Sequence, residues 1–212
     1  MIRLDIFSDI VCPWCYIGKT HLDRALESRA DHPFRIEWHP FQLNPDMPAA
    51  GVGHVDYLAG RFGGRETALT MMQNVAKAAK DAGAEMEIEK VAHLPNTMDA
   101  HRLIHWAGIE GRQTAMVSRL FRAHWREGLD VGDHATLARI AGEVGMDAAA
   151  VARLLATDAD RDDLLARDRD ARQKGVTAVP TFLIAQQYVV SGAQPVHLWQ
   201  GVIDELTTQA KA

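Results

Sequence analysis

The spacing of apolar residues changes along the chain and predicts three parts. Residues 2–7 form a short apolar run, and residues 34–39 alternate between apolar and polar side chains. Both patterns are typical of β-strands. Between them, residues 13–28 carry apolar side chains at helical spacing. The first part, residues 1–55, is therefore predicted to be a βαβ unit that ends in a loop over residues 48–53.

The second part, residues 56–155, shows helical spacing throughout. Helices are predicted over residues 66–82, 97–108, 111–127, 133–145 and 147–155. Asp133 and Asp147 are expected N-cap residues, and Gly83 is an expected stop signal. Leu69 is placed on the inward face of its helix. No linker rich in Pro, Gly and Ser separates this block from its neighbours, so we interpret it as a helical insertion packed over the α/β part.

The last part, residues 156–212, returns to an α/β pattern. A charged helix is predicted over residues 158–174, followed by short strands at residues 181–184 and 188–191. Because only a turn separates these strands, they are predicted to form a hairpin. Pro195 suits the first turn of a final helix.

Candidate chemistry lies between the first strand and the first helix, in the segment Cys12-Pro13-Trp14-Cys15. These two cysteines are the only ones in the sequence. Residues three apart in the first turn of a helix lie on one face, at a Cα separation of about 5–6 Å that suits a disulfide. Closing so short a loop gains little entropy, so the bridge is a poor structural staple. The segment is typical of a redox-active dithiol.

The position of each cysteine predicts its role. Cys12 is expected at the helix N-terminus, where the free N–H groups and the helix dipole favour a thiolate. Pro13 fits the first helical position because its missing N–H is not needed there. Cys15 is expected one turn inward and more deeply buried. We therefore predict that Cys12 is the nucleophile that forms a mixed disulfide and that Cys15 resolves it.

Two other interpretations of the cysteines compete with a redox dithiol, namely a zinc site and a pair of inert core thiols. A zinc site needs about four ligands, and only His21 lies near the pair in sequence, so no metal is predicted. Two inert thiols in the core are the second interpretation, since free cysteine is readily buried. Both are less favoured than a redox dithiol.

Composition narrows the classes of partner. The formal net charge is −5 and no basic tract occurs, which argues against nucleic acid. No apolar run approaches the roughly 20 residues of a membrane span. The first strand begins at Ile2 without a signal-peptide pattern, so we expect a cytoplasmic protein. In a reducing compartment a lone C-x-x-C is more often catalytic than structural.

Five segments carry a resemblance to a known family. They are residues 9–18 (D-I-V-C-P-W-C-Y-I-G), 39–45 (H-P-F-Q-L-N-P), 96–103 (N-T-M-D-A-H-R-L), 175–182 (G-V-T-A-V-P-T-F) and 191–195 (S-G-A-Q-P). Together with the order of the elements, they make the chain similar to DsbA-like oxidoreductases of the cytoplasmic, FrnE-like branch. The resemblance implies an α/β fold, namely a thioredoxin fold with a large all-helical insertion.

The resemblance also implies the site. Val179-Pro180 is expected to be a cis peptide that faces the dithiol, with Pro180 shaping the groove. Val179 and Thr181 are expected to contact substrate, in part by pairing backbone with an extended chain. Trp14 is expected to be an exposed aromatic beside Pro13 at the groove. Because Trp14 replaces the usual His and offers no charge, a weaker oxidant than periplasmic DsbA is predicted.

The same superfamily includes kappa-class glutathione transferases and 2-hydroxychromene-2-carboxylate isomerases, which carry Ser in place of Cys12. That likeness suggests a glutathione site around Asn96, His101 and Arg102. A helix cap with solvated polar residues is the competing interpretation. Asp9 is either a proton acceptor or electrostatic tuner for the thiols, or a loop aspartate.

The predicted function is thiol–disulfide exchange on protein or small-molecule disulfides. A glutathione-dependent isomerase or transferase and a chaperone-like binding protein are the alternatives. No bound cofactor is expected, with glutathione a candidate reductant or co-substrate and a thioredoxin-type protein a candidate redox partner. A monomer and a homodimer both remain open.

Overall fold

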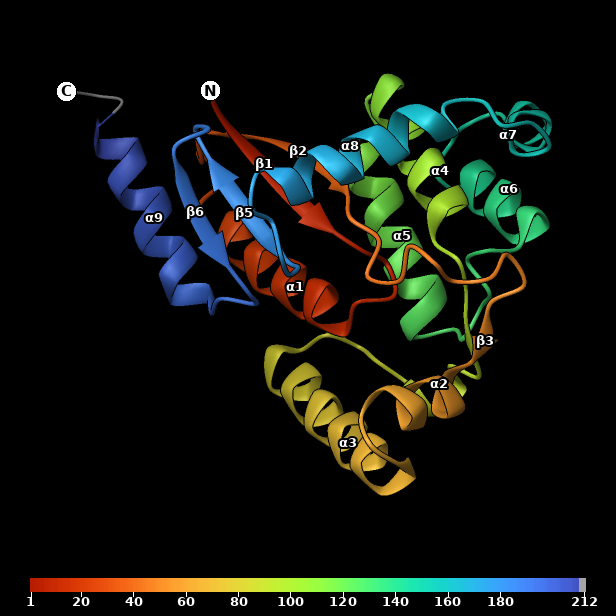
Figure 1. Cartoon of the computed structure of the whole chain (residues 1–212). Helices are drawn as coiled ribbons and strands as arrows, with labels where there is room; N and C mark the ends of the chain where they lie inside the picture. The colour runs from red at the N-terminus through yellow and green to blue at the C-terminus, as the bar shows by residue number, and fades with distance from the viewer. Residues whose placement is uncertain (210–212) are drawn as a thin grey trace.

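The computed structural model describes residues 1–209 and contains a four-stranded sheet in the order β2-β1-β5-β6. Strands β1 and β2 are parallel, and the other neighbours are antiparallel (Figure 1). In the centre of the sheet, Ile6 lies opposite both Trp38 and Phe182. The strands are β1 (Ile2–Ser8), β2 (Phe34–Pro40), β5 (Thr181–Ile184) and β6 (Tyr188–Ser191). The sequence therefore predicted these four strands correctly.

Three helices accompany the sheet. They are α1 (Pro13–Glu27), α8 (Arg161–Gln173) and α9 (Val196–Gln209). Helix α9 packs along α1, and α8 lies against β2. Phe182 of β5 meets Trp199 of α9 edge to face, with the ring centroids 4.7 Å apart. This arrangement places the start of α1 at the end of β1.

The remaining helices join β2 to α8. They are α2 (His54–Arg61), α3 (Arg65–Ala82), a short 3₁₀ turn (Ile88–Lys90), α4 (Met98–Ile109), α5 (Gln113–Trp125), α6 (His134–Glu143) and α7 (Ala148–Leu155). Asp133 accepts a hydrogen bond from the Thr136 amide at 2.7 Å, and Asp147 accepts one from the Ala150 amide at 3.0 Å. Both predicted N-caps are confirmed.

The end of α3 also confirms a predicted signal. Gly83 follows the helix with φ of 73°, the left-handed conformation in which a side chain is disfavoured. An added Cβ would also lie 2.7 Å from the Arg24 guanidinium, which would have to move. The stop at Gly83 therefore lets α3 end against α1.

The predicted loop at residues 48–53 was wrong in part. Val52–Gly53 forms strand β3, which pairs with β4 (His93–Leu94) in a small antiparallel sheet. Helix α2 follows directly and was not predicted as a separate element. Two-residue strands have no periodicity to detect, and their pairing depends on a partner far along the chain.

The predicted inward position of Leu69 was also wrong, because its side chain is 46% exposed. The covered stripe of α3 instead runs through Ala68, Met72, Val75 and Ala79. These residues are spaced four, three and four apart, so they share one helix face that Leu69 does not join. The small side chains of Ala68 and Ala79 on the covered face allow α3 to lie close to the elements that it packs against.

One large apolar core spans all three predicted parts of the chain. It includes Leu4 of β1, Leu120 of α5, Leu137 of α6 and Trp199 of α9. The division at residues 55 and 155 remains a prediction, and residues 210–212 of its last part lie outside the described residues. Within residues 1–209, none of the helices combines the length and apolar character that a membrane span requires.

Candidate active site

The two thiols lie at the start of α1. Cys12 is the N-cap residue, with extended backbone angles, and Pro13 occupies the first helical position. The Cys15 amide donates to the Cys12 carbonyl at 3.1 Å, which closes the turn between them. Cys12 is 3% exposed, Cys15 is 1% exposed, and both are free thiols. The nucleophile and resolver predicted from the sequence therefore lie in one helical turn. Cys15 is buried as expected, whereas Cys12 is more buried than we expected for an attacking thiol.

The peptide bond between Val179 and Pro180 is cis, as the resemblance implied. The Cys12 thiol donates to the Val179 carbonyl at 3.6 Å. Thr181 begins β5 and donates its hydroxyl to the Ala178 carbonyl at 2.7 Å. The structure thus brings the cis-proline turn, more than 160 positions away in sequence, into contact with the dithiol.

Gly18 is a site residue that the sequence reasoning did not single out. A Cβ added there would lie 3.1 Å from Cγ of Pro180 and 3.3 Å from the Ala193 backbone. Contacts that short are tighter than ordinary packing, so a side chain at this position would require a small shift of the cis-proline turn or of the Ala193 segment. The glycine in the quoted 9–18 motif was the only available signal.

The environment of Cys15 disfavours its thiolate. Burial raises the pKa of the Cys15 thiol well above its ordinary value, and the neighbouring Cys12 sulfur raises it further. The Ser8 hydroxyl and the Asp9 backbone partly oppose this effect. Cys15 is therefore expected to stay protonated until Cys12 has formed a mixed disulfide.

Asp9 lies beneath the dithiol and joins three segments. Its Oδ2 accepts a hydrogen bond from the Leu43 amide at 2.8 Å, and its Oδ1 lies 3.3 Å from Nε2 of His101. Both side chains are almost completely buried. The pair links the dithiol loop to the segment after β2 and to α4, and it places an ionisable pair under the thiols.

Asn96 is occupied by backbone contacts. Its amide nitrogen donates to the Met47 carbonyl at 2.7 Å, and its oxygen accepts from the Met98 amide at 3.0 Å. Neither Asn96 nor His101 lines the cleft beside Cys12. Their predicted contact with glutathione stays a prediction.

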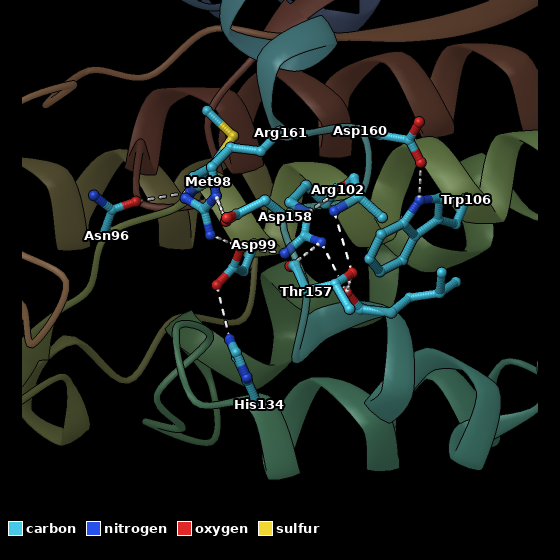
Figure 2. A network of polar contacts seen from close by, with 12 residues as sticks. Asn96, Met98, Asp99, Arg102, Trp106, His134, Thr157, Asp158, Asp160 and Arg161 are labelled. Carbon is cyan, nitrogen blue, oxygen red and sulfur yellow. Dashed lines mark hydrogen bonds and ion pairs between the residues drawn. The ribbon is translucent and has the colours of Figure 1, made fainter.

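Arg102 is neither solvated nor available to an anion, so both sequence interpretations of it were wrong. It is 0% exposed. The polar contacts in Figure 2 show its guanidinium enclosed by acceptors. Those acceptors are the carbonyls of Leu154 (2.9 Å), Thr157 (2.7 Å) and Ala159 (2.7 Å) and the Asp99 carboxylate (2.9 Å). The residue is structural, joining α4 to the segment after α7.

A cleft of about 370 Å³ opens beside Cys12. Its lining comes from α2 and α3, from the dithiol segment and from the residues before the cis-proline. The lining includes Cys12, Pro13, Trp14, His54, Tyr57, Arg61, Met72, Val75, Thr177 and Val179. Trp14 is 44% exposed beside it. The sequence did not point to α2 and α3, because nothing in their patterns distinguishes a cleft wall from a solvated surface.

Among residues 1–209, the ligand atoms suited to a metal gather at Asp5, Glu37 and His39. The Arg3 guanidinium lies 2.6 Å from Asp5 and 3.4 Å from Glu37, and His39 lies 2.6 Å from Asp5. The arginine supplies the positive charge that a metal would bring. We therefore describe this cluster as an ion-pair network on the sheet.

A family model described as a DSBA-like thioredoxin domain matches residues 3–204. The chain belongs to this family. The match confirms the DsbA-like thioredoxin fold inferred from the five motifs, and thiol oxidoreductases are the class to which DsbA-like proteins belong.

Solved structures agree with that assignment. The probable DsbA oxidoreductase SCO1869 from Streptomyces coelicolor is 30% identical, with 97% of this chain and 89% of that chain covered and a TM-score of 0.87. A 2-hydroxychromene-2-carboxylate isomerase is 16% identical, with 99% and 98% covered and a TM-score of 0.75. The cytosolic disulfide reductase DsbM from Pseudomonas aeruginosa, solved with GSH, is 21% identical, with 99% and 100% covered and a TM-score of 0.70. The last two share the fold.

Proposed function

We propose that this DsbA-like protein catalyses thiol–disulfide exchange through Cys12 and Cys15. The observation that carries the proposal is the placement of both thiols in the first turn of α1, with Cys12 3.6 Å from the carbonyl that precedes the cis-proline. A helix N-terminus stabilises negative charge, so Cys12 is the thiol positioned to attack. Cys15 lies one turn inward, within reach of the Cys12 sulfur.

The reaction proceeds in two exchanges. The Cys12 thiolate attacks one sulfur of the substrate disulfide, a Cys12–substrate bond forms, and the other sulfur leaves as a thiolate that takes up a proton. Cys15 then loses its proton and attacks Cys12, which releases the second substrate thiol and leaves a Cys12–Cys15 disulfide. The substrate is reduced by two electrons and the protein is oxidised by two. The reverse sequence oxidises a dithiol substrate.

The raised pKa of Cys15 gives these steps an order. A thiol kept protonated by burial does not compete with Cys12 for the incoming disulfide. Ser8 and the Asp9 backbone, which lower the pKa of Cys15, are placed to stabilise the thiolate when it forms. Val179 lies beside Cys12, and an extended substrate that reaches this thiol could pair with the backbone of Val179. A contact of substrate with Thr181, which begins β5 just after the cis-proline, remains part of the proposal.

We further propose glutathione as the reductant and the cytosol as the compartment. The support is the similar fold of DsbM, described as a cytosolic disulfide reductase and solved with GSH. A monothiol of this kind restores the dithiol by forming a mixed disulfide with Cys12, which a second glutathione resolves.

The test compares Cys12→Ser with Cys15→Ser. Reduced protein is mixed with glutathione disulfide, quenched by alkylation and read by mass. Wild-type protein is expected to gain an internal disulfide, Cys12→Ser to gain nothing, and Cys15→Ser to accumulate one glutathione adduct. Full exchange activity in Cys12→Ser contradicts the proposal, and undiminished glutathione-dependent turnover in Cys15→Ser favours the isomerase or transferase alternative.

A further inference from the structure

The cleft beside Cys12 combines an apolar surface with a single cation. Most of its lining is hydrocarbon, contributed largely by Val11, Trp14, Leu58, Met72 and Val75. No aspartate or glutamate contributes to it, although the chain has 28 acidic residues and a net charge of −5. A region so depleted of carboxylates on an acidic protein favours an acidic ligand.

Arg61 supplies the cation. It lies in the last turn of α2 and lines the cleft. Its side chain is exposed, and no carboxylate among residues 1–209 pairs with it. His54, the other basic side chain in the lining, is kept neutral because burial lowers its pKa. Arg61 is therefore the one charged donor in the lining, and a guanidinium binds a carboxylate through two parallel hydrogen bonds.

We propose that this cleft selects low-molecular-weight disulfides that join an apolar ring system to a carboxylate. The apolar body lies against α3 and Trp14, the carboxylate binds Arg61, and the disulfide sulfur meets Cys12. The inference rests on the proposed function, for which it names the substrate class. A volume of about 370 Å³ lies in the range of small-molecule pockets.

Glutathione itself fits this cleft less well than an apolar acid. Its amino group and two peptide units need polar partners, and the polar lining is sparse. Asn44, one of the few polar residues present, already accepts a hydrogen bond from the Tyr57 hydroxyl. Buried polar groups without partners weaken binding, so a ring system is the better match for this surface.

The electron balance is that of the proposed function. Cys12 forms a bond to the sulfur of the half that occupies the cleft, and the outer half leaves as a thiol. Cys15 then displaces the bound half as a second thiol and leaves the protein disulfide. Two molecules of glutathione, oxidised to their disulfide, return the protein to the dithiol.

The carboxylate contact is tested with two aromatic disulfides, the diacid dithiobis(nitrobenzoate) and the neutral dithiodipyridine. First-turnover rates are measured by stopped-flow absorbance for wild-type protein, Arg61→Gln and Arg65→Gln. Arg65 is another exposed arginine, four residues further along the chain, and it does not line the cleft, so it controls for loss of one positive charge. For each probe, the rate of the variant is divided by the rate of wild-type protein with the same probe. Differences in intrinsic reactivity between the two probes therefore do not affect the comparison.

We expect Arg61→Gln to slow the diacid about tenfold, as for loss of a charge-assisted hydrogen bond, and to change the neutral probe less than about twofold. Arg65→Gln is expected to change neither. The proposal is overturned if Arg61→Gln slows the diacid and the neutral probe equally. It is also overturned if Arg61→Gln and Arg65→Gln slow the diacid equally. Failure of wild-type protein to react with any disulfide through Cys12 would instead overturn the proposed function.

The apolar contact is tested with Val75→Thr, which keeps the shape of the side chain and adds a hydroxyl to the cleft wall. The aliphatic diacid dithiodipropionate is the matched probe, read as a Cys12 adduct by mass. We expect the variant to slow the aromatic diacid about threefold or more while leaving the aliphatic diacid unchanged. Equal slowing of both, or of neither, excludes selection of a ring system.

Discussion

His124 is a buried histidine that no sequence pattern distinguishes from the other histidines. It lies in α5 at 1% exposure, and its ring meets Trp125 edge to face with centroids 4.8 Å apart. Burial lowers the pKa of His124 to about 3, and nearby His54 contributes to the same direction. The neutral ring is therefore the only form compatible with the native packing near neutral pH.

This burial predicts acid lability. Because the pKa of His124 falls from about 6.5 in the unfolded chain to about 3 in the native state, the unfolded state binds the extra proton between these values. The stability present above about pH 6.5 is lost as the pH falls toward 3. We expect His124→Phe to lessen the loss of unfolding free energy between pH 7 and pH 4 by about 3 kcal/mol.

Urea unfolding at the two pH values measures that difference. His197→Phe, the same substitution at an exposed position of α9, is the control and should keep the wild-type pH dependence. An unchanged pH dependence in His124→Phe would show that this histidine does not limit acid stability.

Between elements, Arg102 connects α4 to the segment that leads from α7 to α8. Its four hydrogen bonds run to three backbone carbonyls of residues 154–159 and to Asp99. Burial works to raise the pKa of Asp99, but hydrogen bonds from Arg102 and His134 outweigh it and hold that pKa below its ordinary value. Figure 2 shows Asp99 between these two partners. The buried guanidinium is thus a shared donor to acceptors from two segments.

Removing this arginine is expected to be costly. Arg102→Met keeps the apolar length of the side chain but removes the donor to the carbonyls of Leu154, Thr157 and Ala159. It also removes one of the donors to Asp99, which keeps its contacts with His134 and Arg161. We expect a loss of about 3–5 kcal/mol in unfolding free energy, measured by denaturant titration. Arg153→Met, at an exposed position of α7, is the matched control and should cost less than about 0.5 kcal/mol. A loss below about 1 kcal/mol in Arg102→Met would contradict the structural role.

Across the chain as a whole, burial is uneven. In α3, 18 residues long, only Ala68, Ala79 and Ala82 are buried, whereas α5 buries seven of its 13 residues. Figure 1 shows α2 and α3 together at the lower edge of the molecule, below α1. Helix α2 touches the end of α5, where the ring centroids of His54 and Trp125 lie 6.3 Å apart. The wall of the proposed substrate cleft is thus the part of the helical block with the least buried surface.

This difference predicts local opening. Segments with few buried contacts open at lower free energy than the core. We expect the amides of α3 to exchange hydrogen at least tenfold faster than those of α5 under native conditions, measured by mass spectrometry of peptides. Equal protection of the two helices would show that α3 unfolds only with the whole chain.

The sequence alone determined the four strands of the main sheet, most of the helices and the thiol pair. Alternation over residues 34–39, the caps at Asp133 and Asp147 and the stop at Gly83 each depend on residues within a few positions, so a local pattern contains the information. The same holds for the placement of Cys12 and Cys15 in one helical turn. The cis peptide before Pro180 came from the family motif and not from the local pattern, since most X-Pro bonds are trans.

Tertiary structure decided what surrounds the thiols. The inward face of α3, the enclosure of Arg102 and the approach of His101 to Asp9 all depend on segments distant in sequence. Whether a polar side chain is solvated, structural or free to bind a ligand follows from which of those segments meets it. For the same reason Arg61, which nothing in the sequence distinguishes from other arginines, becomes the single cation of a cleft only once α2 packs beside Cys12.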